Sequence, residues 1–324
     1  MNPEQANTPD LSVIIASSDG KRGLADMYQR ILVPLDESDA AEVALPYAEE
    51  LAVKLGAEVV MVSVSEPDVA DTDRLSSYVE AVSTQVQREL GEWDIKSEAK
   101  LTNKVLEGKP ATEILGYASK NNIDLIVMAS RGRSNRGPWV LGSISAKVLR
   151  ATRIPILLIR AAAASEAVQQ KRLVKKIMVP LDGSDVGSMA IPHVENLARA
   201  LDADIVLFHA IIEPVPVVVA PGVEFAYMPV MSKEDEGRRV ASAMGYLSTM
   251  EQALTEKGLK ASSEVSSGSP ANEIIRYAEA NSIDLIAMST HGRSGISRWV
   301  FGSVTDKVLH AGVTPVFVVQ AKKD

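Results

Sequence analysis

The chain carries two copies of one long sequence pattern, and this repeat constrains its fold more than any other feature. ILVPLDESD, starting at Ile31, matches IMVPLDGSD, starting at Ile177. GKPATEIL, starting at Gly108, matches GSPANEII, starting at Gly268, with about 14 more residues between these blocks in the second copy. Agreement in both sequence and spacing indicates a duplicated domain rather than a chance motif.

Each copy also contains one glycine loop with the pattern Gly-x9-Gly-Ser. The first loop runs from Gly132 to Gly142-Ser143, and the second from Gly292 to Gly302-Ser303. Each loop lies between an apolar strand pattern and an amphipathic helix pattern. Glycines let the backbone approach phosphate oxygens, and the amino end of a helix offers unpaired N–H groups. We therefore expect two phosphate sites, with the serine acting as helix cap and phosphate donor.

Composition narrows the class of protein. The 324 residues suffice for two domains of ordinary size. A net charge of −8 argues against binding to nucleic acid or to an anionic membrane. The absence of cysteine excludes disulfides, thiol catalysis and thiolate zinc sites. No apolar run reaches the roughly 18 to 20 residues of a membrane span, and the start lacks a signal peptide pattern, so we expect a cytoplasmic protein.

The repeat gives the domain boundaries. Residues 1–27 have no counterpart and are expected to form a partly disordered extension. The first domain is predicted at 28–162, a linker at 163–172 and the second domain at 173–324. The extra residues of the second copy fall in a Pro- and Val-rich loop near 213–230, where four prolines exclude a regular central strand or helix.

Strand and helix patterns alternate within each copy, which is typical of a parallel sheet covered on both faces. We predict the strands at Ile31–Leu35, Glu58–Val64, Lys96–Val105, Leu125–Ala129 and Ile156–Ile159, then at Ile177–Leu181, Ile205–Ala210, Lys260–Val265, Leu285–Met288 and Val316–Val319. Helices are predicted at Ala40–Leu55, Ser76–Glu92, Ala111–Asn121 and Ser143–Arg150. Pro46 and Pro192 fall inside one helix pattern, where we expect a shared kink. The fold class is α/β, with two tandem doubly wound five-stranded parallel-sheet sandwiches.

Other phosphate-binding motifs fit the loops less well. A Walker loop needs Gly-Lys-Ser/Thr after four residues, yet Gly137 is followed by Pro138 and Trp139. A dinucleotide fingerprint would follow the first strand, where the chain has Asp-Glu-Ser-Asp. Ligands of open α/β sheets bind beyond the carboxyl ends of the strands, where strand order reverses. The PLDxSD blocks and the glycine loops are both expected at that edge.

These motifs resemble the universal stress proteins in their tandem two-domain, ATP-binding form, with the adenine nucleotide alpha hydrolase-like fold. The resemblance covers about residues 28–160 and 173–320. The family motif is Gly-x2-Gly-x9-Gly-Ser/Thr, and its last two glycines and its serine are present in both copies. Ala129 and Ser289 replace its first glycine, a departure that could make the two sites unequal.

The resemblance implies ATP as ligand, with Mg²⁺ as its companion ion, and it names no metal ligands in the chain. Asp36 and Asp182 would contact adenosine. The adenine pocket would be lined by Pro34, Val64, Pro180 and Ala210, and the phosphates held by Gly132, Gly142, Ser143, Gly292, Gly302 and Ser303. Neighbouring residues counted in the sites are Leu35, Met128, Ala129, Arg133, Ile144, Leu181, Met288, Ser289, Arg293 and Val304.

The resemblance also implies a nucleotide-dependent regulator or sensor of the stress response rather than a dedicated enzyme. Its last strands, Ile156–Ile159 and Val316–Val319, would pair the domains as an intramolecular pseudo-dimer, and two chains would form a homodimer. A regulatory protein partner is expected but not identified. No catalytic residue is predicted, because no carboxylate recurs inside both glycine loops.

Three alternatives stay open. Asp36 and Asp182 could simply begin helix caps, and the glycine pairs could be ordinary turns. The chain could be a nucleotide-free scaffold that binds a partner through the 213–230 loop. Slow ATP hydrolysis or self-phosphorylation of a loop serine is a third reading.

Overall fold

The computed structural model describes residues 27–67, 72–91, 99–132, 141–160, 172–212, 233–290 and 301–320. The first half contains β1 (Arg30–Pro34), α2 (Asp39–Glu42), α3 (Leu45–Leu55), β2 (Glu58–Ser65), α4 (Thr72–Gly91), β3 (Leu101–Glu107), α5 (Pro110–Lys120), β4 (Leu125–Ala129), α6 (Ser143–Ala151) and β5 (Ile156–Ile159). The second half contains β6 (Lys176–Pro180), α8 (Asp185–Ser188), α9 (Ile191–Leu201), β7 (Asp204–Ile211), α10 (Lys233–Glu256), β8 (Ala261–Ser267), α11 (Pro270–Ala280), β9 (Leu285–Ser289), α12 (Ser303–Ala311) and β10 (Val316–Val319).

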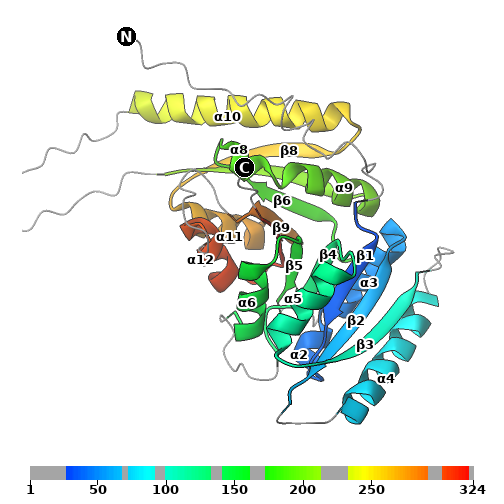
Figure 1. Ribbon diagram of the computed structural model, residues 1–324. Helices are drawn as coiled ribbons and strands as arrows, with labels where there is room; N and C mark the ends of the chain where they lie inside the picture. Colours follow the sequence, from blue (N-terminus) through cyan, green and yellow to red (C-terminus); the bar gives the residue numbers. More distant parts are fainter. Residues whose placement is uncertain are drawn as a thin grey trace, which may run out of the picture.

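The described strands form a single ten-stranded sheet in the order β3-β2-β1-β4-β5-β10-β9-β6-β7-β8. Every neighbouring pair is parallel except β5 and β10, which pair antiparallel at the centre of the sheet. Helices pack on both sides of this sheet (Figure 1). In the first half, β2 and β3 lie on one side of β1, and β4 and β5 lie on the other. In the second half, β7 and β8 lie on one side of β6, and β9 and β10 on the other. Strand order therefore reverses between β1 and β4 and between β6 and β9. The predicted α/β class with tandem doubly wound halves is confirmed.

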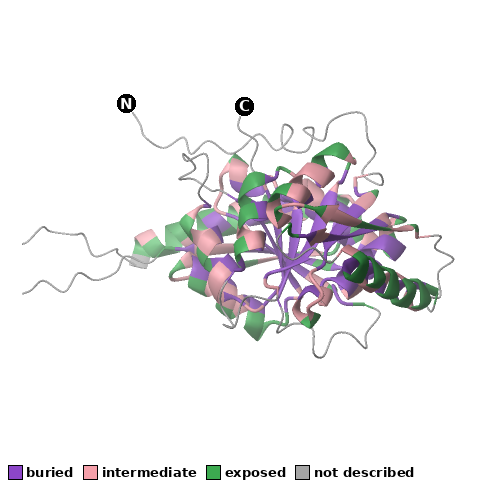
Figure 2. Ribbon diagram, turned by 60° about the horizontal axis from the view of Figure 1, so that its bottom comes forward, coloured by how far each residue is buried: buried purple, intermediate pink, exposed green. Residues whose placement is uncertain are grey.

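The alternation of side chains along the strands divides the core into two layers. Ile31 and Val33 pack in one buried cluster, and Leu32, between them, packs in the other. Both clusters contain residues of both halves, so the apolar core is continuous across the central strand pair. Figure 2 shows the buried strands at the centre with partly exposed helices around them. Burial of both strand faces explains why the strands read as apolar runs.

The helix predicted at Ala40–Leu55 is wrong as one element. It is split into α2 and α3, and the second half repeats the split as α8 and α9. Pro46 and Pro192 lie in the first turn of α3 and α9, where a residue without an N–H loses no intrahelical bond. The two prolines therefore begin a helix, and the predicted kink is corrected to a break.

Other boundaries moved only slightly. Strand β3 begins at Leu101 rather than at Lys96, and α4 begins at Thr72, before the predicted Ser76. The predicted linker, apart from residue 172, the N-terminal extension, apart from Met27, and the whole 213–230 loop lie outside the described residues.

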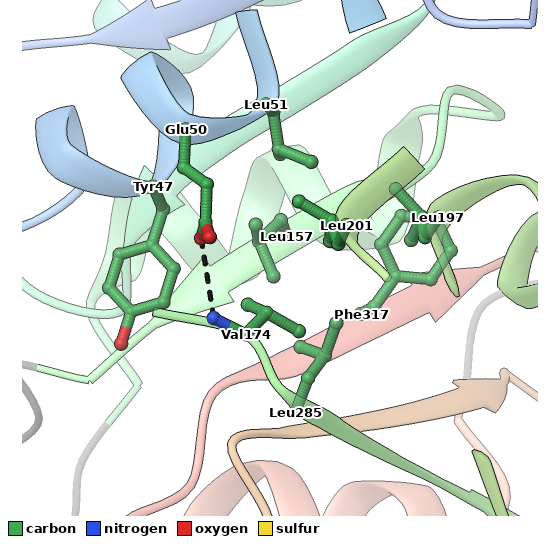
Figure 3. A pocket seen from close by; sticks show the side chains of 9 residues that line it. All are labelled: Tyr47, Glu50, Leu51, Leu157, Val174, Leu197, Leu201, Leu285 and Phe317. Atoms are coloured by element: carbon green, nitrogen blue, oxygen red, sulfur yellow. Dashed lines mark hydrogen bonds between the residues drawn. The ribbon is translucent and has the colours of Figure 1, made fainter. Parts of the chain in front are cut away.

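The central strand pair joins the two halves. Phe317 lies opposite Leu157 in the β5–β10 register, and the pairing of these two strands is the one that the family resemblance implied. Beside it, the Tyr28 hydroxyl is 2.5 Å from Nδ1 of His193, which ties the start of the first half to α9. Figure 3 shows a small, mainly apolar pocket at this junction, lined by residues of both halves, with the Glu50 carboxylate at its edge. The halves are therefore packed as one body around their last strands.

Candidate functional site

The PLDxSD turn and the first glycine loop meet at the reversal point of the first half. β1 ends at Pro34 and the neighbouring β4 ends at Ala129, so the residues after both strands emerge at one edge of the sheet. A Cβ added to Gly132 would lie 2.0 Å from Oδ2 of Asp36, which places the glycine backbone directly against the carboxylate. A side chain at this position would therefore force the Asp36 carboxylate to move. Two predicted site residues, distant in sequence, are thus in contact.

The aspartates of the two turns orient a serine rather than cap a helix. Oδ1 of Asp36 accepts hydrogen bonds from the backbone N–H and the hydroxyl of Ser38. The Ser38 hydroxyl oxygen in turn accepts the N–H of Ala41 at 3.2 Å and caps α2. Asp36 therefore begins the capping turn by holding Ser38, which is itself the N-cap of α2. Its other oxygen, Oδ2, faces Gly132.

The second half repeats this arrangement. Oδ1 of Asp182 accepts the backbone N–H of Ser184 at 3.0 Å and its hydroxyl at 2.6 Å. Ser184 caps α8 through the N–H of Gly187. Asp182, like Asp36, is held in place by the residue two positions later.

The described ends of each glycine loop are tied together by hydrogen bonds. The Gly142 N–H donates to the Ser130 carbonyl at 2.8 Å, and the Gly302 N–H donates to the Thr290 carbonyl at 2.9 Å. Each loop therefore leaves its strand and returns to the same place before its helix begins. Because a Cβ on Gly142 would lie 3.2 Å from the Ser130 carbonyl oxygen, this close return is favoured by glycine.

A buried hydroxyl in each helix supports this closure. The Ser145 hydroxyl donates to the Ala129 carbonyl at 2.9 Å, and the Thr305 hydroxyl donates to the Ser289 carbonyl at 3.0 Å. These bonds fix the first turn of α6 and α12 to the end of the strand before the loop. Sequence reasoning missed both residues, although a hydroxyl recurs three positions after the last glycine in both copies.

The glycines, not the serines, are the N-caps of α6 and α12. Gly142 and Gly302 have extended backbones and no side-chain cap bond, so the predicted capping role of Ser143 and Ser303 is wrong. Both serines are the first helical residue, and both are exposed. Since the first intrahelical bond runs from the Ala146 N–H to the Gly142 carbonyl, the amides of residues 143–145 point out of the helix. Such an end carries about half a positive charge.

The remaining predicted site residues differ in how far they are buried. Leu35 and Leu181 are 4% exposed, and their amides donate to the carbonyls of Val62 and Phe208. The Leu35 carbonyl also accepts the Ser63 hydroxyl at 2.8 Å, so both leucines are packed into the strand ends. Buried positions at the strand ends are Pro34, Met128, Ala129, Met288 and Ser289, whereas Val64, Ile144, Pro180, Ala210 and Val304 are half-buried. Arg133, Gly292 and Arg293 lie outside the described residues.

The two turns differ in charge. Glu37 and Glu42 in the first half are replaced by Gly183 and Ser188 in the second. Glu42 accepts the Tyr78 hydroxyl at 2.8 Å, whereas the Ser188 hydroxyl pairs with Tyr246 at 3.1 Å. Burial, followed by the neighbouring carboxylate of Glu42, holds the pKa of Tyr78 far above its ordinary value. The first turn therefore has two acidic side chains that the second lacks, one of which, Glu37, is paired with Arg74 at 2.9 Å.

Within the described ranges, 27 to 320 with their gaps, no cluster of three or more His, Cys, Asp or Glu side chains could hold a metal ion. No helix in these ranges has the length and apolarity needed to span a bilayer.

Comparison with known proteins gives a consistent match over both halves. The Universal stress protein family model matches residues 27–160 and 174–320. A universal stress protein of Methanocaldococcus jannaschii is 33% identical over 153 residues, covering 47% of this chain and 86% of its own length. One of Synechocystis is 24% identical over 315 residues, covering 89% and 98%.

A solved structure that covers most of the chain agrees on the fold. The crystal structure of a universal stress protein from Archaeoglobus fulgidus matches 90% of this chain and 98% of its own, with a TM-score of 0.64 and 20% identity. A universal stress protein crystallised in complex with cAMP matches 41% of this chain and 98% of its own, with 20% identity and a TM-score of 0.33.

Proposed function

Because the chain belongs to the Universal stress protein family, we propose that each half binds one adenine nucleotide, with ATP as the principal ligand. In this proposal the protein is a nucleotide-dependent regulator in the response to stress. It acts through the occupied or empty state of its two sites, in the cytoplasm, rather than through rapid turnover of a substrate.

The meeting of Asp36 with Gly132 is the observation that carries this proposal. It brings a carboxylate, which accepts ribose hydroxyls, to the entrance of a glycine loop. The same loop ends at the amino end of α6, which attracts phosphate. A ligand that reaches from the Asp36 carboxylate to the amino end of α6 needs hydroxyl groups at the carboxylate and an anionic group at the helix end. A nucleotide meets both requirements.

The helix ends would hold the phosphates. Three outward amides and the exposed hydroxyl of Ser143 or Ser303 are suited to phosphate oxygens. If three or four such charge-assisted hydrogen bonds each contribute roughly 1.5 to 3 kcal/mol, micromolar affinity, about −8 kcal/mol, survives the ordering costs. Mg²⁺ bound with the nucleotide would offset phosphate charge.

We propose binding without rapid hydrolysis. A hydrolase needs a group that positions or activates water beside the terminal phosphate. Asp306, in the first turn of α12, has Ala146 as its counterpart in α6, so the two sites share no such carboxylate at this position. Incubation with ATP should give ADP slowly or not at all.

Substitution of Gly132 by alanine tests this function. The new Cβ would displace the Asp36 carboxylate, so we expect binding at one of two sites to fall by at least tenfold, measured by calorimetry with ATP and Mg²⁺. Gly116→Ala, in α5 where nothing lies within 4 Å of the added Cβ, is the matched control. Titration with cAMP and GTP defines the preferred base and phosphate number. Two unchanged ATP sites in Gly132→Ala would overturn the proposal.

A further inference from the structure

The helices that begin at the two phosphate loops end against the opposite half of the molecule. The guanidinium of Arg160, directly after β5, donates to the carbonyls of Val308, at 3.2 Å, and Leu309 in the last turn of α12. The side-chain amide of Gln320, directly after β10, donates to the Leu149 carbonyl in α6 at 2.8 Å. These contacts are reciprocal, because Arg160 and Gln320 occupy the same position of the repeat, as do Leu149 and Leu309.

The same two residues adjoin the loop of their own half. The Ile159 carbonyl, just before Arg160, accepts the Ser130 N–H at 2.7 Å. The Val319 carbonyl, just before Gln320, accepts the Thr290 N–H at 2.9 Å. Ser130 and Thr290 are the residues on which the glycine loops close. The last residue of each of these strands thus contacts the loop of its own half through its carbonyl, and the residue after it contacts a helix of the other half through its side chain.

The Arg160 contact is buried and charged. Arg160 is only 5% exposed. Burial, followed by the charge of Arg131, lowers its pKa to about 10, so the guanidinium stays protonated at neutral pH. A cation at the carboxyl end of a helix is favourable, and removing one partner of a buried charged hydrogen bond leaves the other unsatisfied. The position of α12 therefore depends on Arg160.

We propose that Arg160 and Gln320 are positioning residues that act across the central strand pair, each fixing the helix whose amino end forms the other half's phosphate site. Arg160 in the first half would support the second site, and Gln320 in the second half would support the first. This inference rests on the proposed nucleotide binding. Nucleotide bound at either site would be coupled to the other through α6 and α12, which lie on the same side of the sheet (Figure 1).

A third contact between the halves has no counterpart in the repeat. Cζ of Arg150, in the last turn of α6, lies 5.9 Å from the ring centre of Phe301. Phe301 directly precedes Gly302, the N-cap of α12. Helix α6 therefore spans from the end of the first loop to the end of the second. The corresponding positions hold His310 and Leu141, which cannot form the same cation–ring contact.

The test measures each site separately in the full-length chain. Asp36→Ala disables the first site and leaves the second, and Asp182→Ala does the reverse. In the Asp36→Ala background, Arg160→Met should weaken ATP binding at the second site by about 3- to 30-fold, the range for residues that modulate coupling. In the Asp182→Ala background, Gln320→Leu should weaken the first site by a similar factor.

Arg160→Gln is the matched control, since it installs the side chain that the second half uses at this position. It removes the charge but keeps a donor for the α12 carbonyls, so it should restore most of the second-site affinity lost in Arg160→Met. Both Arg160 variants are also made in the Asp182→Ala background, where any change at the first site that Gln and Met share reports only the loss of charge near Arg131. Thermal unfolding confirms that each variant is folded before titration.

Equal weakening of both sites by Arg160→Met, or no weakening of the second site, would overturn the inference while leaving nucleotide binding intact. Absence of ATP binding in all parent proteins would instead overturn the proposed function, and the inference with it. If Arg160→Met does not fold, Gln320→Leu in the Asp182→Ala background tests the inference alone. This substitution removes an uncharged, half-buried donor and so disturbs folding less. Unchanged ATP affinity at the first site would then overturn the inference.

Discussion

At the scale of single residues, the two copies of the PLDxSD turn use one backbone conformation with different residues. Glu37 has φ of +64°, and its counterpart Gly183 has φ of +79°. This region is unfavourable for residues with a side chain and open to glycine. In the first half, Arg74 forms an ion pair with Glu37 at 2.9 Å that offsets part of the strain. The repeat itself contains the signal, since glycine in one copy marks the turn in both.

Gly183→Ala should therefore destabilise the protein by about 1 to 2 kcal/mol in chemical denaturation. The control is Gly245→Ala, at an exposed position inside α10 with nothing within 4 Å of the added Cβ. That substitution should stabilise the protein by up to about 1 kcal/mol, because alanine is the better helix former. Equal effects of the two substitutions would contradict the strained-turn account.

Glu50 makes the junction of the halves sensitive to pH. Its carboxylate is 1% exposed and accepts the amides of Leu173, at 3.0 Å, and Val174, at 3.3 Å, where the second half begins. Burial raises the pKa of Glu50 to about 7, although those two amides and the charges of Lys54 and Arg172 act in the opposite direction. The nearby Tyr47 also has a raised pKa, about 12, mainly through burial.

A carboxyl group with a raised folded-state pKa favours the folded state fully below its unfolded pKa, here 4.5, and this advantage is lost as pH rises through about 7. The free energy of unfolding of the native protein, relative to Glu50→Gln, should thus fall by up to about 3 kcal/mol between pH 4.5 and 7, at about 1.36 kcal/mol per pKa unit. Urea unfolding at both pH values measures it. A difference that does not vary with pH would show that Glu50 has an ordinary pKa.

At the scale of elements, the sequence predicted the inner strands best. The strands at Leu125–Ala129, Ile156–Ile159 and Val316–Val319 have the predicted bounds, because they are short apolar runs buried on both faces. The break between α2 and α3 was missed although Pro46 and Pro192 recur at the same position of the repeat, because a proline inside a helical pattern is compatible with a kink as well as with a new start. The closing bonds of the loops depend on tertiary contact between strand end and helix, which local sequence does not contain.

The hydroxyl of Ser145 offers a test of loop closure. Ser145→Ala leaves the buried Ala129 carbonyl without this donor, which should cost about 1 to 3 kcal/mol of stability and weaken ATP binding at the first site. Ser145→Thr should keep both properties near their native values, since Thr305 makes the same bond in the second half. Calorimetry and thermal unfolding report the two effects. Similar behaviour of the alanine and threonine variants would contradict the role of the hydroxyl.

At the scale of the whole molecule, the repeat predicts two similar halves, but only the resemblance to universal stress proteins predicted how they join. The antiparallel pairing of β5 with β10 makes one continuous sheet and one continuous core. All residues of both strands are buried. Neither half could expose its last strand without uncovering apolar surface and unpaired backbone groups.

Cutting the chain between the halves should therefore not separate them. A protease site inserted within 161–171, once cleaved, should leave two fragments that elute together at the size of the intact chain during gel filtration. Phe317→Ala in the cleaved protein should promote separation, because it removes a fully buried ring that faces Leu157 across the pair. Separation of the cleaved native fragments would show that the linker, not the strand pair, holds the halves together.

The central claim is that the molecule holds one adenine nucleotide in each half, and the amount of bound nucleotide tests it most directly. Freshly purified protein should be denatured and its released nucleotides identified by mass. A second sample should be dialysed to equilibrium against saturating ATP and Mg²⁺, and the nucleotide bound in excess of the dialysate counted per chain. The account predicts two adenine nucleotides per chain in the saturated sample and one in Gly132→Ala. No adenine nucleotide in either sample, together with no heat of binding on titration, would contradict it.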